Sequence, residues 1–311
     1  MNPAFSVVVF TVLAGAAQGL VVALALAVLA GVSMSAQFLS RGLLVAVVLL
    51  VLGLGASFLH LGRPERAWRS AMMWRTSWLS REVIALPAFI GLVALWWWAS
   101  RFMDADFLKR ALLPGAALAL AALLWYCTAM IYACLRFIEE WAHPLTLVNF
   151  VALGLSSGFV LASALAAIAG ESTILTWSGP IAIALTLVAW VTRMTALRRN
   201  AGIRHRSTLQ TATGLRSPRL VQTSMGMSAG SFNTREFFHC ASRVAMQRIR
   251  LAVIGLAFVA PLAAMLMAWL DSWPALWLAA FLLQVPGLIA DRWYFFAQAK
   301  HPQNLYYQVV S

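Results

Sequence analysis

The chain has 311 residues, of which 62% are hydrophobic and 11% are charged. A soluble domain has about 45–50% apolar and about 25% charged residues, so an ordinary soluble enzyme, a disordered chain and a small disulfide-rich scaffold are excluded. Lys and Arg exceed Asp and Glu by 13, which in a soluble protein would indicate a nucleic-acid partner. Here the basic residues stand between apolar runs, so orientation in a membrane explains them better and no nucleic-acid partner is expected.

Eight apolar runs are each long enough to cross a bilayer, which takes roughly 20 helical residues. Lipid admits only helices or closed barrels, and these runs do not alternate as barrel strands do. We therefore predict an all-α integral membrane protein in which residues 1–311 form a single domain of eight transmembrane helices, packed as two helical bundles. The runs lie near Phe5–Gly31, Gly42–Leu59, Val83–Ala99, Ala111–Phe137, Pro144–Gly170, Ile174–Val191, Ile249–Leu270 and Pro274–Phe296.

The basic residues predict how the chain is oriented. With eight spans, both termini share one side with the loops after the second, fourth and sixth helices. That side holds 19 Lys and Arg residues and the other side holds 4. The positive-inside rule then predicts an inner (cytoplasmic) membrane protein with both termini in the cytoplasm.

Two loops on the basic side are unusually rich in Arg. The second loop also carries three Trp, and an interfacial anchor is the simplest alternative to a functional role. The sixth, at about residues 198–248, is too long and polar for a tight turn. We expect a partner to order it, and a loop held by anionic lipid is the alternative.

The second loop joins two ionisable residues at the predicted membrane edge. His60 ends the second predicted helix and Glu82 begins the third, and such groups are functional candidates because they are costly there. A quinone head group needs hydrogen-bond partners and a proton route, which a His and a Glu supply, while Arg63, Arg66 and Arg81 would stabilise the Glu anion. The alternative is structural: His60 caps its helix, and Glu82 serves the dipole of the next one.

The cysteines and histidines argue against a metal site. Cys127, Cys134 and Cys240 are odd in number and lack a close C-x-x-C pair, which disfavours a disulfide framework, a thiolate zinc site or an Fe–S cluster. Every histidine falls at the cytoplasmic edge, which disfavours a haem across the bilayer centre. We therefore expect no metal in this chain, and an edge haem between His60 and His143 stays open as an alternative.

Charged residues also occur inside a predicted span. Asp291 and Arg292 adjoin in the last turns of the eighth helix. A local structural pair or an interfacial anchor is the simplest interpretation, and a proton path through Asp291 is the alternative.

The stretch SFLHLGRPERAWRS, followed by SWLSRE, resembles the membrane anchor subunits of the DmsC family, which belong to dimethyl-sulfoxide-reductase-type molybdoenzymes. The later stretch STLQTATGLRSPRL, with GSFNTREFFH, is more similar to the SoeC-type anchor of cytoplasmic sulfite-oxidising complexes. The resemblance covers essentially the whole chain, and its specific motifs lie in the second loop. The His and Glu that the family associates with quinol binding match His60 and Glu82.

The resemblance implies a complex of three subunits. One is a molybdopterin catalytic subunit that works on the substrate, and another is an Fe–S subunit that transfers electrons. The anchor in the lipid bilayer exchanges these electrons with ubiquinone or menaquinone. It is then not catalytic toward the substrate itself, although quinone reduction or quinol oxidation takes place on it. Sulfite oxidation with quinone reduction is the leading expectation, and a menaquinol-oxidising anchor is the alternative.

Two rival classes fit the sequence less well. A secondary transporter tends to place charges near the midplane, often in repeated halves, whereas here the ionisable groups gather at one edge. A stand-alone membrane enzyme would need a nucleophile or a metal motif such as H-x-x-x-H, which the sequence does not contain.

Overall fold

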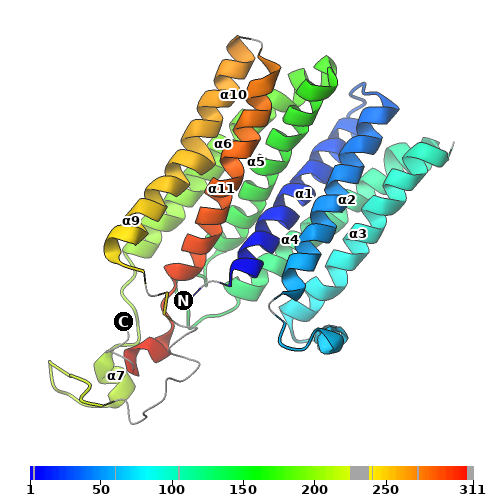
Figure 1. Ribbon diagram of the computed structural model, residues 1–311. Helices are drawn as coiled ribbons and strands as arrows, with labels where there is room; N and C mark the ends of the chain where they lie inside the picture. Colours follow the sequence, from blue (N-terminus) through cyan, green and yellow to red (C-terminus); the bar gives the residue numbers. More distant parts are fainter. Residues whose placement is uncertain are drawn as a thin grey trace.

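The computed structural model describes residues 1–2, 4–59, 61–103, 106–224, 238–239, 241–271 and 273–306. Within these residues it is helical with no strand, and eight helices are long and apolar enough to cross a membrane (Figure 1). The predicted fold class is confirmed, and the protein is a multi-pass membrane protein.

Six of the spanning helices are single α-helices, and two contain a π-helical segment. The first four spans are α1 (Phe5–Leu29), α2 (Ala36–Phe58), α3 (Trp78–Phe102), and the π-helical η2 (Leu108–Leu112) continued by α4 (Leu113–Ala133). The other four are α5 (Pro144–Ala169), α6 (Ser172–Ala201), α9 (Arg243–Ala252) continued by the π-helical η3 (Val253–Val259) and α10 (Ala260–Leu270), and α11 (Pro274–Ala297). Short helices are η1 (Pro64–Ala71), α7 (Leu209–Thr213) and η4 (Pro302–Tyr306).

The spans form two groups of four that meet along α1 and α5. The first bundle consists of α1, α2, α3 and α4, and the second consists of α5, α6, α10 and α11 (Figure 1). These two central helices are more deeply buried than any other span, and they are apolar on all sides because protein surrounds them.

Glycines allow α1 and α5 to touch. A Cβ atom on Gly158 would lie 2.0 Å from the carbonyl carbon of Gly19, closer than any real side chain can sit. Gly15 and Gly19 on α1 face Gly154 and Gly158 on α5, so each helix carries a small-xxx-small pair at the contact. Such pairs let helix backbones approach closely inside a membrane.

Two predicted helix boundaries were wrong. The sixth run was expected to end at Val191, but α6 continues to Ala201, because Arg193 is paired inside the bundle instead of lying in water. The seventh span begins at Arg243 instead of near Ile249. Several arginines assigned to the sixth loop therefore lie on helices.

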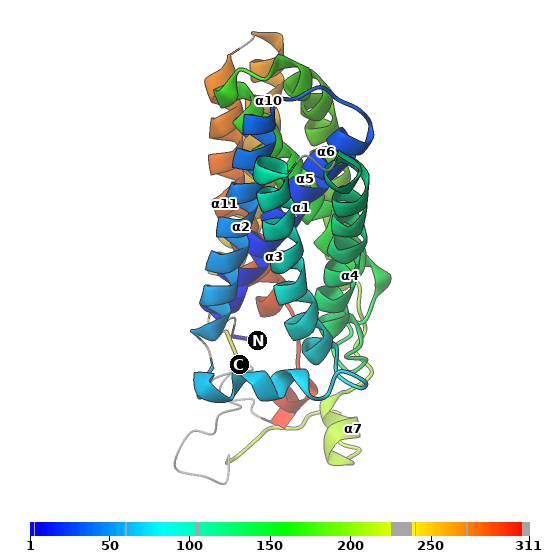
Figure 2. The ribbon, with the colours of Figure 1, turned by 90° about the vertical axis from the view of Figure 1, so that its right-hand side faces the viewer.

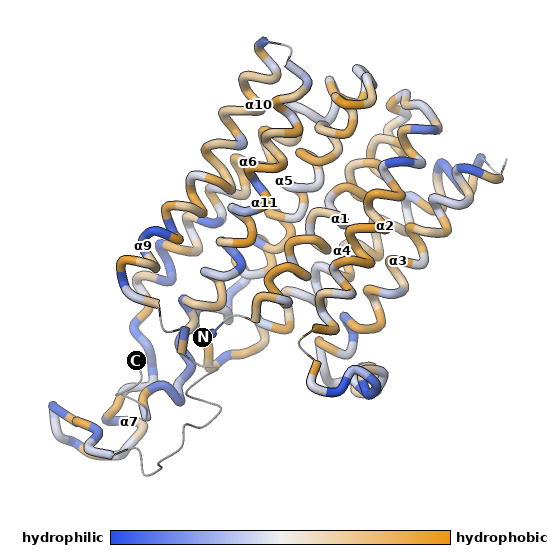
Figure 3. The backbone as a smooth tube through the Cα atoms, in the orientation of Figure 1, coloured by the Kyte–Doolittle hydropathy of each residue, from blue (hydrophilic) through white to orange (hydrophobic). Residues whose placement is uncertain are grey.

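One end of the molecule, which we call the basic end, gathers both chain ends, η1, α7 and η4 (Figures 1 and 2). Figure 2 shows η1 running across the ends of the first bundle instead of along the helices. The amino group of Met1 donates to the carbonyls of Ala297 (3.4 Å) and Ala299 (3.2 Å) at the end of α11. Hydrophilic residues concentrate at this end, and hydrophobic residues follow the helices (Figure 3).

Candidate functional site

Glu82 lies in the second turn of α3, near the basic end. The helix begins at Trp78, and the Oγ of Ser77 caps it by accepting the backbone N–H of Ser80 at 3.3 Å. The expectation that Glu82 begins this helix and serves its dipole was therefore wrong. Ser77 already performs the cap, so the carboxylate is not needed for it.

The carboxylate of Glu82 is buried, with 6% of the residue exposed. It accepts a hydrogen bond from the hydroxyl of Thr128 on α4, which links α3 to α4. Among the described residues no cation forms an ion pair with Glu82. A carboxylate buried with only a neutral partner is energetically costly, which marks it as a functional candidate.

Arg81 ties the second loop to the start of α3. Its Nε donates to the carbonyl of Trp74 and its Nη2 to that of Arg75, both at 2.9 Å. The guanidinium also lies 4.0 Å from the ring centre of Trp78, which meets Tyr126 edge to face at 5.3 Å. Arg81 therefore braces an aromatic pair beside Glu82 on α3.

The other predicted site residues lie on or beside η1. Arg63 is exposed and immediately precedes this helix, and the Nε of Arg66 lies 3.9 Å from Oε1 of the exposed Glu65. The structure does not pair either arginine with Glu82. His60 lies outside the described residues, so its role stays a prediction.

A second buried polar group lies between α6 and α11. Nε of Arg193 donates to Oδ1 of Asp291 at 2.5 Å, and the two side chains are 3% and 1% exposed. The expected local pair of Asp291 with Arg292 was wrong, because the guanidinium of Arg292 instead lies 3.7 Å from the ring centre of Phe150. Arg193 was not predicted as an intramembrane charge, because the sixth helix was expected to end at Val191.

His143 serves as the cap of α5. Its Nδ1 accepts the backbone N–H of Leu145 at 3.1 Å. Burial, with a smaller contribution from the nearby Arg199, holds the pKa of His143 below its ordinary value. A capping imidazole has one nitrogen already committed, which leaves only Nε2 for any other partner.

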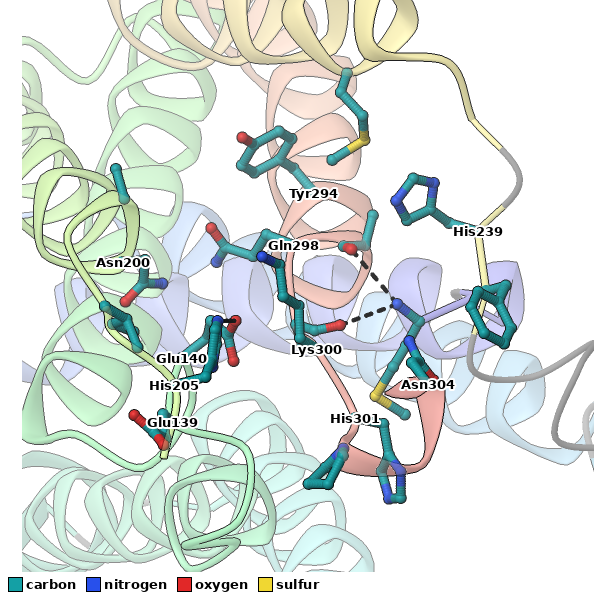
Figure 4. A pocket seen from close by; sticks show the side chains of 18 of the residues that line it. Glu139, Glu140, Asn200, His205, His239, Tyr294, Gln298, Lys300, His301 and Asn304 are labelled. Carbon is teal, nitrogen blue, oxygen red and sulfur yellow. Dashed lines mark hydrogen bonds and ion pairs between the residues drawn. The ribbon is translucent and has the colours of Figure 1, made fainter. Parts of the chain in front are cut away.

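A cavity with a volume of about 1110 Å³ opens at the basic end of the second bundle (Figure 4). Its wall includes Glu139, Glu140 and His205, and Nε2 of His205 lies 3.5 Å from Oε1 of Glu140. This group was not predicted from the sequence. The signal that could have found it was the only pair of adjacent acidic residues, Glu139 and Glu140, in a strongly basic chain.

The comparisons with known proteins agree with this architecture. Residues 1–307 match the family described as the DMSO reductase anchor subunit (DmsC). The chain is also 48% identical to the C component of the sulfite dehydrogenase of Allochromatium vinosum, over an alignment of 326 positions that covers 100% of both proteins. The resemblance found in the sequence is confirmed, including its SoeC-type character. The chain belongs to the DmsC family of membrane anchor subunits.

Proposed function

We propose that this anchor binds quinone near the basic end of the first bundle and passes electrons between an Fe–S partner and the quinone pool. The complex would also contain a molybdopterin catalytic subunit. Similarity to a sulfite dehydrogenase component supports sulfite oxidation with quinone reduction. The alternative is menaquinol oxidation, which the DMSO reductase anchors of the family suggest.

The observation that carries the proposal is the buried carboxyl of Glu82, held by Thr128. Bound quinone would supply the two-electron chemistry. Glu82 would hold or release a proton at its carboxyl, and the Thr128 hydroxyl would orient that group. Trp78 and Tyr126 offer flat apolar rings on the same two helices, and these residue types fit an aromatic head group.

The basic end is proposed to face the cytoplasm and to dock the Fe–S partner through the second and sixth loops. Along the second loop, Trp68 is 63% exposed and Trp74 is 53% exposed. Arg69 and Arg75 stack on these two rings at 5.5 and 5.3 Å. Protein interfaces are enriched in Trp and Arg, so this surface suits a partner protein.

Replacing Glu82 by Gln tests the proposal. An amide still accepts the hydrogen bond from Thr128, so the packing of α3 on α4 is preserved, but it cannot titrate. We expect the complex to assemble normally and turnover with quinone to fall at least about tenfold, which is about 1.4 kcal/mol of barrier. Turnover with a soluble dye should persist.

The matched control is Glu65→Gln, which removes an exposed carboxylate on η1 at the same end of the molecule. It should leave turnover with quinone unchanged. Wild-type turnover of the Glu82→Gln complex from about pH 6 to about pH 9 would contradict a proton-handling role for Glu82.

A further inference from the structure

The cavity of about 1110 Å³ belongs to the second bundle, whereas Glu82 belongs to the first. It lies between the ends of α6 and α11, with α9 and η4 beside it (Figure 4). Phe137, Leu197, Leu209 and Leu305 contribute apolar surface to its wall. The cavity therefore combines an apolar lining with a position at the basic end of a membrane protein.

Two buried polar atoms among the lining residues have no hydrogen-bond partner within the described part of the chain. One is the acceptor Oε2 of Glu140, a residue 6% exposed, and the other is the donor Nε2 of Gln298. Buried polar groups are normally hydrogen-bonded, and each exception calls for a bound partner or a functional reason. The wall thus offers one acceptor and one donor to an occupant.

The charges in the cavity indicate what kind of occupant fits. Glu139 and Glu140 line it, and so do Arg250 and Lys300. A cationic or an anionic head group would each meet a like charge, which disfavours a basic side chain of a partner and the phosphate of a lipid alike. A neutral head group that can both accept and donate hydrogen bonds meets no such repulsion.

We propose that this cavity is a second binding site for the head group of a quinone, apart from the site at Glu82. The inference rests on the proposed quinone function and extends it to the second bundle. Gln298 Nε2 would donate to a carbonyl of the oxidised head group, and Glu140 Oε2 would accept from a hydroxyl of the reduced one. His205, 29% exposed and 3.5 Å from Glu140, connects that carboxylate to water.

The test is photolabelling of the intact complex with an azido-quinone, followed by identification of the labelled peptides by mass spectrometry. We expect two labelled groups in the wild type, one from residues 61–82 and one from residues 197–209 and 294–305. Excess unlabelled quinone should suppress both groups.

The decisive variant is Gln298→Leu. Because Nε2 has no hydrogen-bond partner among the described residues, the substitution removes no bond within them, and the fold should persist. Labelling of the cavity peptides should fall about tenfold, the effect of one lost hydrogen bond of about 1.4 kcal/mol, while labelling of residues 61–82 is unchanged. Gln303→Leu, exposed and outside the cavity lining, is the control that should match the wild type.

The possible results separate this inference from the proposed function. Labelling of residues 61–82 alone overturns the second site and leaves the first intact. Labelling of the cavity peptides alone supports the second site and contradicts the placement of quinone at Glu82, and no labelling at all overturns both. Cavity peptides that become labelled only after the Fe–S partner is stripped would show a partner segment in the cavity, which also overturns the second site.

Discussion

Arg193 and Asp291 are 98 positions apart in the chain, yet their side chains meet at 2.5 Å inside the second bundle. The pair joins α6 to α11 where water does not reach. Removing one member of a buried pair leaves an uncompensated charge, which costs about 3–5 kcal/mol in soluble proteins.

We therefore expect Arg193→Met alone to lower the thermal stability of the purified complex strongly. Combining Arg193→Met with Asp291→Leu should recover much of that loss, because no lone charge is left. Thermal unfolding of the two single variants and the double variant measures the coupling. Strictly additive effects of the two substitutions would contradict a direct interaction.

The contact of α1 with α5 predicts a strong effect of a single methyl group. Gly158→Ala places a Cβ atom 2.0 Å from the Gly19 carbonyl carbon, so the two central helices must separate. Overpacking of this kind costs about 1–3 kcal/mol or more, and the thermal midpoint should fall accordingly. Gly91→Ala in α3, where no atom lies within 4 Å of the added Cβ, is the matched control and should be tolerated. Equal stability of the two variants would contradict the close contact.

His143 predicts a pH dependence of stability. Burial lowers its pKa in the folded protein, so the folded state binds a proton less readily than the unfolded chain does. The contribution of His143 is therefore present above the unfolded pKa of about 6.5 and is lost as the pH falls through the lower folded pKa. His143→Asn keeps a capping side chain without a titrating group and should reduce the loss of stability below about pH 6.5. The measurement is the thermal midpoint of both proteins between about pH 5 and about pH 7.5, and parallel curves would argue against this contribution.

The proposed docking surface predicts that charge at the basic end retains the Fe–S partner. Arg216 and Arg219 are exposed in the sixth loop. Reversing both to Glu should weaken retention of the partner in washed membranes, and raising the salt concentration should weaken retention in the wild type by screening. The control is Arg101→Glu at the opposite end, which should retain the partner normally. Retention by the double variant equal to the wild type would contradict docking on this loop.

The spans could be predicted from the sequence because their signal is local: each apolar run shows by itself that it must lie in lipid. The end of α6 could not, because hydropathy treats Arg193 as a residue for water, and the partner that lets it stay buried is on another helix. Glu82 was found as an isolated ionisable residue, but its partner Thr128 depends on how α3 packs against α4. The cavity was missed for the same reason, because His205 and Glu140 meet only when two loops of different helices converge.

The central claim is that quinone binds beside the second loop, and the most direct measurement is the ratio of turnover with quinone to turnover with a soluble dye in a complex carrying His60→Ala. If His60 contacts the quinone head group, the variant complex should assemble, keep its activity with dye and lose coupling to quinone. The His143→Asn complex serves as a control and should keep both activities. A His60→Ala complex that reduces quinone at the wild-type rate would contradict the account.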